Sequence, residues 1–263
     1  MDDFSLKITY YGQCCFLIEA NGLRIVTDPY LSYGVDEKNA ASSVPWHRNY
    51  PPLCSLIELD PDLIIISHAH DDHLDPITLK QYLESNGSAP IMLPAPIADI
   101  AKDIGFRKVY QARAEHMSLF KNASIMPIAC AHTSLDMDDK GRFYNLSYFL
   151  DFGDSCVFFG GDMSLYDGLS ERIILENCSV LLLPCNGRDQ ERTKAGIIGN
   201  ITAEEAAVLA KETDVLFIPC HHDLYDCNGR SVSEIEDCAR KEGAKLCILK
   251  PGGSYVLKEE DDS

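Results

Sequence analysis

The segment at residues 68–73 constrains this chain more than any other. It directly follows the apolar run Leu63 to Ile66 and contains four residues able to bind metal, His68, His70, Asp72 and His73. The run predicts a buried strand, so the four polar side chains would gather in one small pocket at its end. A bound cation is the simplest compensation for burying them together. A polar loop that merely contains histidines is the alternative, but histidine is uncommon here, with eight in 263 residues.

Further along the chain, three more apolar runs of strand length end close to residues able to bind metal. They are residues 125–130 before His132, residues 157–159 before Asp162, and residues 215–218 before His221 and His222. Strands that carry ligands at one end let distant segments converge on one rigid site. Each later residue taken alone is more often structural, but the context shared with residues 68–73 favours a common metal site.

On these residues the chain resembles the metallo-β-lactamase superfamily of hydrolases over nearly its whole length. The H-x-H-x-D-H motif of that family matches His68, His70, Asp72 and His73, and its later ligands match His132, Asp162 and His221. By the same resemblance, Asp28 supports the loop at residues 68–73, here called the metal loop, without binding metal. The chain departs from the common pattern at Gln13, where relatives often carry histidine.

The resemblance implies an α/β fold, the αββα four-layer sandwich of the metallo-β-lactamase fold, with residues 1–263 as a single domain. The sequence pattern agrees, because strands come first and then alternate with helices. Strands are expected at residues 6–10, 15–19, 23–27, 180–183, 215–218 and 245–249, and helices at residues 76–83, 97–104, 203–211 and 233–241. A doubly wound nucleotide-binding fold is the competitor, but no G-x-G-x-x-G motif joins a strand to a helix.

The resemblance also implies how divalent ions would be held. Family geometry assigns His68, His70 and His132 to one ion and Asp72, His73 and His221 to a second, with Asp162 as the bridge. Such a donor set suits Mn²⁺ or Zn²⁺, which would activate a water for attack on a carbonyl carbon. If only one ion binds, Asp72 becomes a candidate general base. Asp72 and Asp162 are therefore the expected catalytic residues, and one or two ions remain open.

A finer resemblance, to the L-ascorbate-6-phosphate lactonase group, lies in residues 184–188, 199–207 and 218–225. It implies a metal-dependent hydrolase that opens a small anionic sugar lactone. Asn186, Arg188 and His222 are the candidate substrate contacts, with Arg188 as a bidentate anion anchor. A phosphodiesterase of the same fold is the main alternative, and a non-catalytic binding or redox protein on this scaffold is the third.

Composition narrows the partners and the location. The net charge of -18 and pI near 4.7 repel nucleic-acid phosphates, which disfavours the nucleases of the superfamily and favours a small-molecule substrate. The apolar runs are too short to cross a membrane, and an odd count of eleven cysteines favours reduced, buried thiols. We therefore expect a cytoplasmic protein and leave self-association open. The irregular segment 32–57 is a candidate substrate loop.

Overall fold

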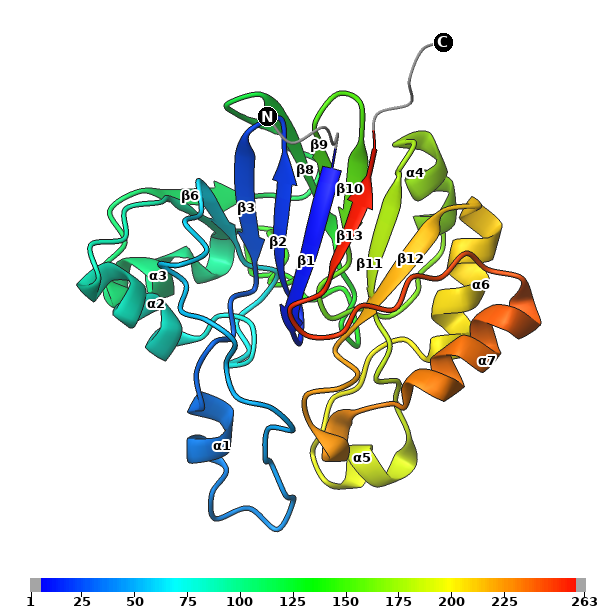
Figure 1. The fold of residues 1–263 in the computed structure, drawn as a ribbon. Coiled ribbons are helices and arrows are strands. Elements are labelled where there is room, and N and C mark those ends of the chain that lie inside the picture. The colour runs from blue at the N-terminus through cyan, green and yellow to red at the C-terminus, as the bar shows by residue number, and fades with distance from the viewer. Residues whose placement is uncertain (1–5, 259–263) are drawn as a thin grey trace.

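The computed structural model describes residues 6–258, in which two mixed β-sheets pack face to face (Figure 1). The first sheet contains, in spatial order, β13 (Ser254–Leu257), β1 (Leu6–Gly12), β2 (Cys15–Ala20), β3 (Leu23–Thr27), β4 (Leu63–Ile65), β5 (Ile91–Pro94) and β6 (Val109–Ala112). The second contains β12 (Leu216–Cys220), β11 (Val180–Pro184), β10 (Cys156–Phe159), β9 (Leu146–Asp151), β8 (Ala123–Ala129) and β7 (Ser118–Phe120).

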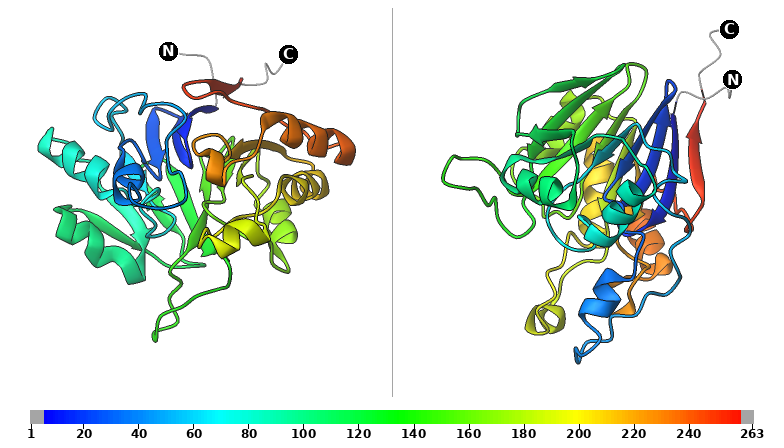
Figure 2. Two further views of the ribbon diagram at one scale, coloured as in Figure 1. Left: turned by 90° about the horizontal axis from the view of Figure 1, so that it is seen from below. Right: turned by 90° about the vertical axis from the view of Figure 1, so that its left-hand side faces the viewer.

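Helices cover the outer face of each sheet, as the end-on view in Figure 2 shows. The helical elements are α1 (Gly34–Lys38), α2 (Pro76–Glu84), η1 (Ala95–Ile97), α3 (Ala98–Ile104), α4 (Leu169–Leu175), α5 (Gln190–Lys194), α6 (Ala203–Thr213), η2 (Asp226–Asn228) and α7 (Val232–Glu242). Helices α2 and α3 pack on the first sheet, and α4, α6 and α7 pack on the second. The predicted αββα sandwich is therefore confirmed.

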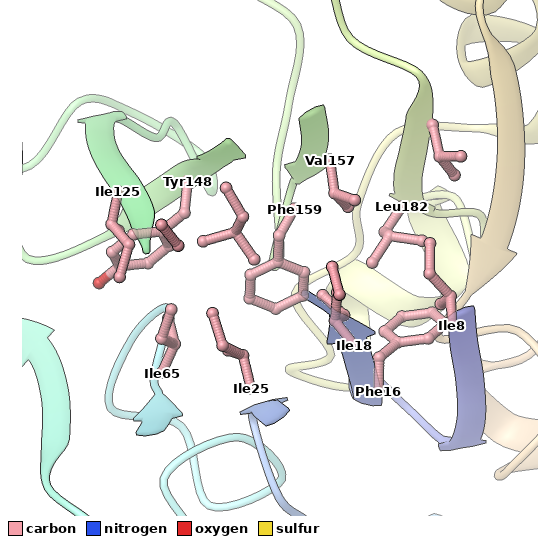
Figure 3. Packing of buried hydrophobic residues seen from close by; sticks show 14 of the residues in the cluster. Ile8, Phe16, Ile18, Ile25, Ile65, Ile125, Tyr148, Val157, Phe159 and Leu182 are labelled. Carbon is pink, nitrogen blue, oxygen red and sulfur yellow. The ribbon is translucent and has the colours of Figure 1, made fainter. Parts of the chain in front are cut away.

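Apolar side chains fill all three spaces between the layers. Between the sheets, Phe16 and Ile25 from the first face Phe159 and Leu182 from the second (Figure 3). Successive residues of one strand serve different layers, since Leu181, next to Leu182, packs under the helices. Strands buried on both faces read as continuous apolar runs, which explains the sequence pattern that precedes each metal-ligand candidate.

Helix starts follow local capping chemistry. The Asp75 carboxylate accepts a hydrogen bond from the Ile77 amide at 3.0 Å, and Pro76 occupies the first turn of α2, as the sequence predicted. Helix α6 begins with a capping box in which Thr202 and Glu205 satisfy each other's backbone amides. These caps fix where each helix starts relative to the strand before it.

The strand expected at residues 245–249 is absent, so that prediction was wrong. Only Leu246 forms an isolated bridge there, with Phe217, and residues 245–249 form no regular strand. This segment leaves the edge of the second sheet to reach β13, which pairs with β1 in the first sheet. A chain that must cross between two sheets cannot pair along one edge for long.

The carboxyl ends of four strands meet at the lower end of the sandwich in Figure 1. Strand β4 leads to His68, β8 to His132, β10 to Asp162 and β12 to His221. Helices α1 and α5 lie below these strand ends and flank the loops between them. Among residues 6–258, no helix has the length and apolar character needed to cross a bilayer.

Candidate metal centre

All seven predicted metal ligands converge at these strand ends. One group comprises His68, His70, His132 and Asp162, and a second comprises Asp72, His73 and His221. Within each group the candidate ligand atoms lie within 4.8 Å of one another. The two groups are those that the family resemblance assigned to two ions, and His70 is the exposed member.

Asp162 stands between the two groups. Its Oδ2 lies 3.4 Å from His132 Nε2 and 4.0 Å from His68 Nε2. Its Oδ1 lies 3.3 Å from His73 Nε2 and 3.5 Å from His221 Nε2. Each carboxylate oxygen therefore faces one group, which is the arrangement that a bridging ligand requires.

Gln13 completes the surroundings of the second group. Its Nε2 donates to Asp72 Oδ2 at 2.7 Å and lies 3.3 Å from His221 Nε2. Its backbone carbonyl accepts from the His221 amide at 2.9 Å. Where relatives often carry histidine, this chain therefore places an amide that orients both Asp72 and His221.

Asp28 supports the metal loop from behind. Its Oδ1 accepts from the Ser67 amide at 2.7 Å, and its Oδ2 accepts from the Ser67 hydroxyl at 2.5 Å. The same Oδ2 lies 2.7 Å from His73 Nδ1. Both oxygens are engaged by the loop, so Asp28 does not point a free carboxylate at the two groups, although Cys14, Asp28 and His73 lie close enough to form a third cluster.

Burial and neighbouring charges together shift the pKa values of the histidines and carboxylates at the site. Burial lowers the pKa of His68 well below its ordinary value and also lowers the pKa of His132, which leaves both imidazoles neutral and able to bind a cation. Burial alone would raise the pKa of Asp162, but the His221 and His73 imidazoles hold it well below its ordinary value. Burial opposes charge on His73 too, yet the Asp162, Asp72 and Asp28 carboxylates raise its pKa well above the ordinary value.

Several ring nitrogens at the site have no hydrogen-bond partner among the described residues. They are His73 Nε2, both ring nitrogens of His132, and His221 Nδ1, all of them buried. A buried polar atom left unpaired costs about 1–3 kcal/mol. His73 Nε2 faces Asp162 Oδ1 and His132 Nε2 faces Asp162 Oδ2, so a cation in either group would satisfy an imidazole nitrogen and a carboxylate oxygen together. The donor set of imidazoles and carboxylates fits a divalent transition ion.

The backbone is constrained where it carries the site. Gln13, Asp28 and His221 adopt positive φ values of 50°, 35° and 56°. Conformations of this kind cost free energy and concentrate at ligand clamps. Gly161, before Asp162, has φ of 63°, and a Cβ there would lie 2.6 Å from Ser67 Cβ. The absence of a side chain at Gly161 therefore allows the backbone before Asp162 to approach Ser67 closely.

A cleft of about 280 Å³ opens onto the two groups. From the site it is lined by His70, Asp72, Asp162 and His221. Its other lining residues include Val35, Lys38, Trp46, Asp71, Ile197, Ile198 and Asn228. The volume suits a small molecule rather than a polymer. The segment 32–57 supplies four lining residues, Val35, Lys38, Asn39 and Trp46, in keeping with its predicted role as a substrate loop.

The three predicted substrate contacts lie away from this cleft lining. Asn186 is fully buried, and its amide bonds to Asn228 and Asn200. Arg188 makes a two-pronged ion pair with Glu205, at 2.7 and 2.6 Å, beside a separate surface depression. The buried His222 ring stacks on Tyr10, and neither of its nitrogens has a hydrogen-bond partner among the described residues. The cleft therefore contains none of the three.

The sequence analysis missed the side chains that do line the cleft opposite the two groups. Lys38 ends the short helix α1, Asn228 ends the short helix η2, and Trp46 lies in an irregular segment. None of these stretches is long enough for a periodic pattern to indicate which way a side chain points. Gln13 had a signal, because it stands where relatives often carry histidine. The fold, rather than the spacing along the chain, brings these residues together.

Comparison with known proteins agrees with this geometry. The chain is 22% identical over 260 residues, covering 96% of it and 100% of the relative, to a UPF0173 metal-dependent hydrolase of Carboxydothermus hydrogenoformans. Its fold is similar to that of Igni18, a metallo hydrolase from Ignicoccus hospitalis, with a TM-score of 0.72, 19% identity and coverage of 97% and 99% of the two chains. An isothiocyanate hydrolase from Delia radicum gut bacteria gives a TM-score of 0.74 at 14% identity, covering 96% and 99%.

A match to a sequence family settles the wider relationship. The family described as the beta-lactamase superfamily domain matches residues 7–221, which run from β1 to the last of the seven ligand candidates. The match therefore includes every strand end that contributes to the two groups. This chain belongs to the beta-lactamase superfamily and has the metallo-β-lactamase fold.

Proposed function

We propose that this protein is a metal-dependent hydrolase of small molecules, with a metal centre formed by the two groups. The placement of Asp162 carries the proposal, because its two oxygens face separate imidazole sets across 3.3–4.0 Å. The metal-dependent hydrolase of Carboxydothermus hydrogenoformans is similar in sequence over its whole length, and the metallo hydrolase Igni18 has a similar fold over 99% of its chain. A protein without metal would have no evident reason to bury so many uncompensated imidazoles and carboxylates together.

In this proposal His68, His70 and His132 would hold one ion, Asp72, His73 and His221 would hold a second, and Asp162, which faces both groups, would serve both. Mn²⁺ or Zn²⁺ in these positions would supply an activated water and polarise the substrate oxygen. Asp72 has a further role if only one ion binds, because its carboxylate lines the cleft and can accept a proton from water. Gln13 holds that carboxylate in place.

For the substrate, we propose a small lactone that carries an anionic group. Lys38 is a cation in the cleft lining, and it pairs with Asp71 at the entrance. Both side chains are largely exposed, and exposed ion pairs are weak, so an anionic substrate can compete for Lys38. This proposal assigns the role of anion anchor to Lys38 rather than to Arg188, because the Arg188 guanidinium already forms an ion pair with Glu205.

A second substrate class is favoured by a different part of the cleft. Val35, Trp46, Ile197 and Ile198 provide an apolar wall beside the two groups. Such a wall suits a substrate with a hydrophobic tail and a reactive carbon, as in the isothiocyanates named for one structural neighbour. The acidic chain as a whole still disfavours nucleic acid as a substrate, and we retain a cytoplasmic location as a proposal.

One screen tests the proposal and separates these classes. Protein loaded with Mn²⁺ or Zn²⁺ is assayed in parallel against L-ascorbate 6-phosphate, a neutral lactone, phenethyl isothiocyanate and bis(p-nitrophenyl) phosphate. We expect lactone opening that requires metal and that weakens for the phosphorylated substrate when Lys38 is changed to Ala. Lys80→Ala, an exposed change on α2, is the matched control.

The outcomes distinguish the candidates. Cleavage of the isothiocyanate alone would replace the lactone with the apolar class and keep the hydrolase. Cleavage of the phosphodiester alone would favour the phosphodiesterase that the fold also allows. Failure of the chain to take up any divalent transition ion would overturn the proposal as a whole.

A further inference from the structure

Three buried asparagines from three separate segments form a chain of amide hydrogen bonds. Asn200 Nδ2 donates to Asn186 Oδ1 at 3.0 Å, and Asn186 Nδ2 donates to Asn228 Oδ1 at 2.9 Å. Asn186 and Asn200 are fully buried, and Asn228 is 6% exposed. Asn186 follows β11, Asn200 precedes α6, and Asn228 lies in η2 after β12. The fold therefore brings together residues that are up to 42 positions apart.

The chain of amides has a direction, and its free donor is at the cleft. Asn228 lines the cleft, and its Nδ2 makes no hydrogen bond to any residue in the range 6–258, since only its Oδ1 is bonded. At the other end, Asn200 Oδ1 is buried without a partner. If the oxygen and nitrogen of all three amides were exchanged, the two protons of Asn200 Nδ2 would be buried without an acceptor. Buried N–H groups without a partner are rarer in proteins than buried carbonyl oxygens without one. The donor end therefore faces the cleft.

An arginine fixes the loops that carry these amides. The Arg192 guanidinium donates to the Asn186 carbonyl, to the Gly187 carbonyl at 3.3 Å and to the Gly229 carbonyl at 2.6 Å. It thus ties the loop of Asn186 to the residue that follows Asn228. Because its partner amide and its loop are both held, the Asn228 side chain needs little reordering to meet a substrate.

We propose that Asn228 is a substrate-binding residue, whose Nδ2 donates a hydrogen bond to an oxygen of the substrate in the cleft. Asn186 and Asn200 are positioning residues that act through Asn228. A preorganised N–H donor of this kind stabilises negative charge that develops on a substrate oxygen. The inference rests on the proposed function only in taking the cleft as the substrate site, and it extends to any substrate with an acyl or phosphoryl oxygen.

Binding of inorganic phosphate tests the donor without requiring turnover. Phosphate is an oxyanion probe for the Mn²⁺-loaded protein, and its dissociation constant is measured by titration calorimetry. We expect Asn228→Ala to weaken phosphate binding by about tenfold or more, as for a lost hydrogen bond to a charged acceptor. Metal content should stay unchanged. Asn122→Ala, which removes an exposed amide far from the cleft, is the control.

An isosteric variant separates a donor role from a structural one. Asn228→Asp keeps the shape and the oxygen that accepts from Asn186, but it replaces the donor with an acceptor. We expect it to bind phosphate more weakly than Asn228→Ala because its carboxylate repels the anion. Phosphate binding as tight as in the unchanged protein for either variant, or no saturable phosphate binding by the unchanged protein, would overturn the proposal.

A double-mutant cycle tests the positioning role of Asn186. Asn186→Ala should weaken phosphate binding in the unchanged background and have no further effect when Asn228 is already Ala. Equal effects of Asn186→Ala in both backgrounds would show that it does not act through Asn228. The readout is independent of the reaction: a protein that opens no lactone but shows the Asn228 effect would disprove the proposed substrate and leave this inference standing.

Discussion

His73 Nδ1 lies 2.7 Å from Asp28 Oδ2, and both side chains are completely buried. This contact turns Nε2 of His73 toward Asp72 and Asp162, at 3.7 and 3.3 Å. A carboxylate behind a ligating imidazole fixes the ring and its tautomer and increases its basicity. In the proposed metal centre Asp28 would therefore act through His73, although its own oxygens face the loop.

We expect Asp28→Asn to lower metal affinity by about 10–100-fold, the usual effect of losing a partner behind a ligand. Affinity is measured by competition with a chromophoric chelator. Asp154→Asn, an exposed change in the turn between β9 and β10, is the control and should leave affinity unchanged. Equal affinities in the two variants would contradict the supporting role of Asp28.

Gln13 should affect only one of the two groups. Its amide contacts Asp72 and His221 and makes no contact with His68 or His132 that the described residues show. Gln13→Ala should therefore weaken uptake of one ion in a two-site titration and leave the other site unchanged. Gln81→Ala on α2 is the matched control. A loss of both sites together would mean that the groups do not bind metal independently.

Metal removal should destabilise the folded chain. The seven ligand candidates come from four strand ends, and a ligand bound by the folded state alone stabilises it by mass action. With free metal at 100 times its dissociation constant, we expect about 2.7 kcal/mol of added stability. Thermal unfolding before and after chelation, with metal then restored, measures the change. An unchanged transition temperature would contradict metal binding at a preformed site.

The metal-ligand candidates could be predicted because each follows an apolar run, and such runs are what strands buried on both faces require. The position of His132, Asp162 and His221 after such runs could therefore be recognised from the sequence alone, without knowledge of any tertiary contact. Lys38 and Asn228 had no such signal, since they end the short helices α1 and η2, which follow no apolar run of their own.

The errors also have physical causes. Asn186 stays a predicted substrate contact, but its amide bonds to Asn228, and Asn228 rather than Asn186 lines the cleft. The strands β6, β7 and β13 were not predicted, because they are partly exposed sheet edges without a full apolar run. The buried strands β5 and β9 were also left out of the predicted set, although their residues are apolar enough for strands. Residues 245–249 have the composition of a strand but must cross from one sheet to the other.

Tyr50 should hold the substrate loop against the site. Its hydroxyl donates to Asp223 Oδ1 at 2.9 Å, where Tyr10 also donates at 2.7 Å. The Asn49 amide also bonds to the Leu224 carbonyl at 2.8 Å. Tyr50→Phe should speed amide hydrogen exchange in residues 44–52 and raise KM while metal content stays unchanged. Tyr144→Phe, at an exposed position, is the control. Unaltered exchange would show that the Asp223 contact does not hold the loop.

The sharpest test of the centre compares two ligand candidates with different positions. Asp162 faces both groups, whereas His70 belongs to one of them. Asp162→Ala should therefore remove both ions, and His70→Ala should weaken one site and leave the second measurable. Both variants should lose hydrolysis yet keep the circular dichroism of the unchanged protein, because the cores lie between the layers rather than at the strand ends. Near-native turnover in either variant with metal present, or a retained pair of ions in Asp162→Ala, would mean that the reaction takes place elsewhere.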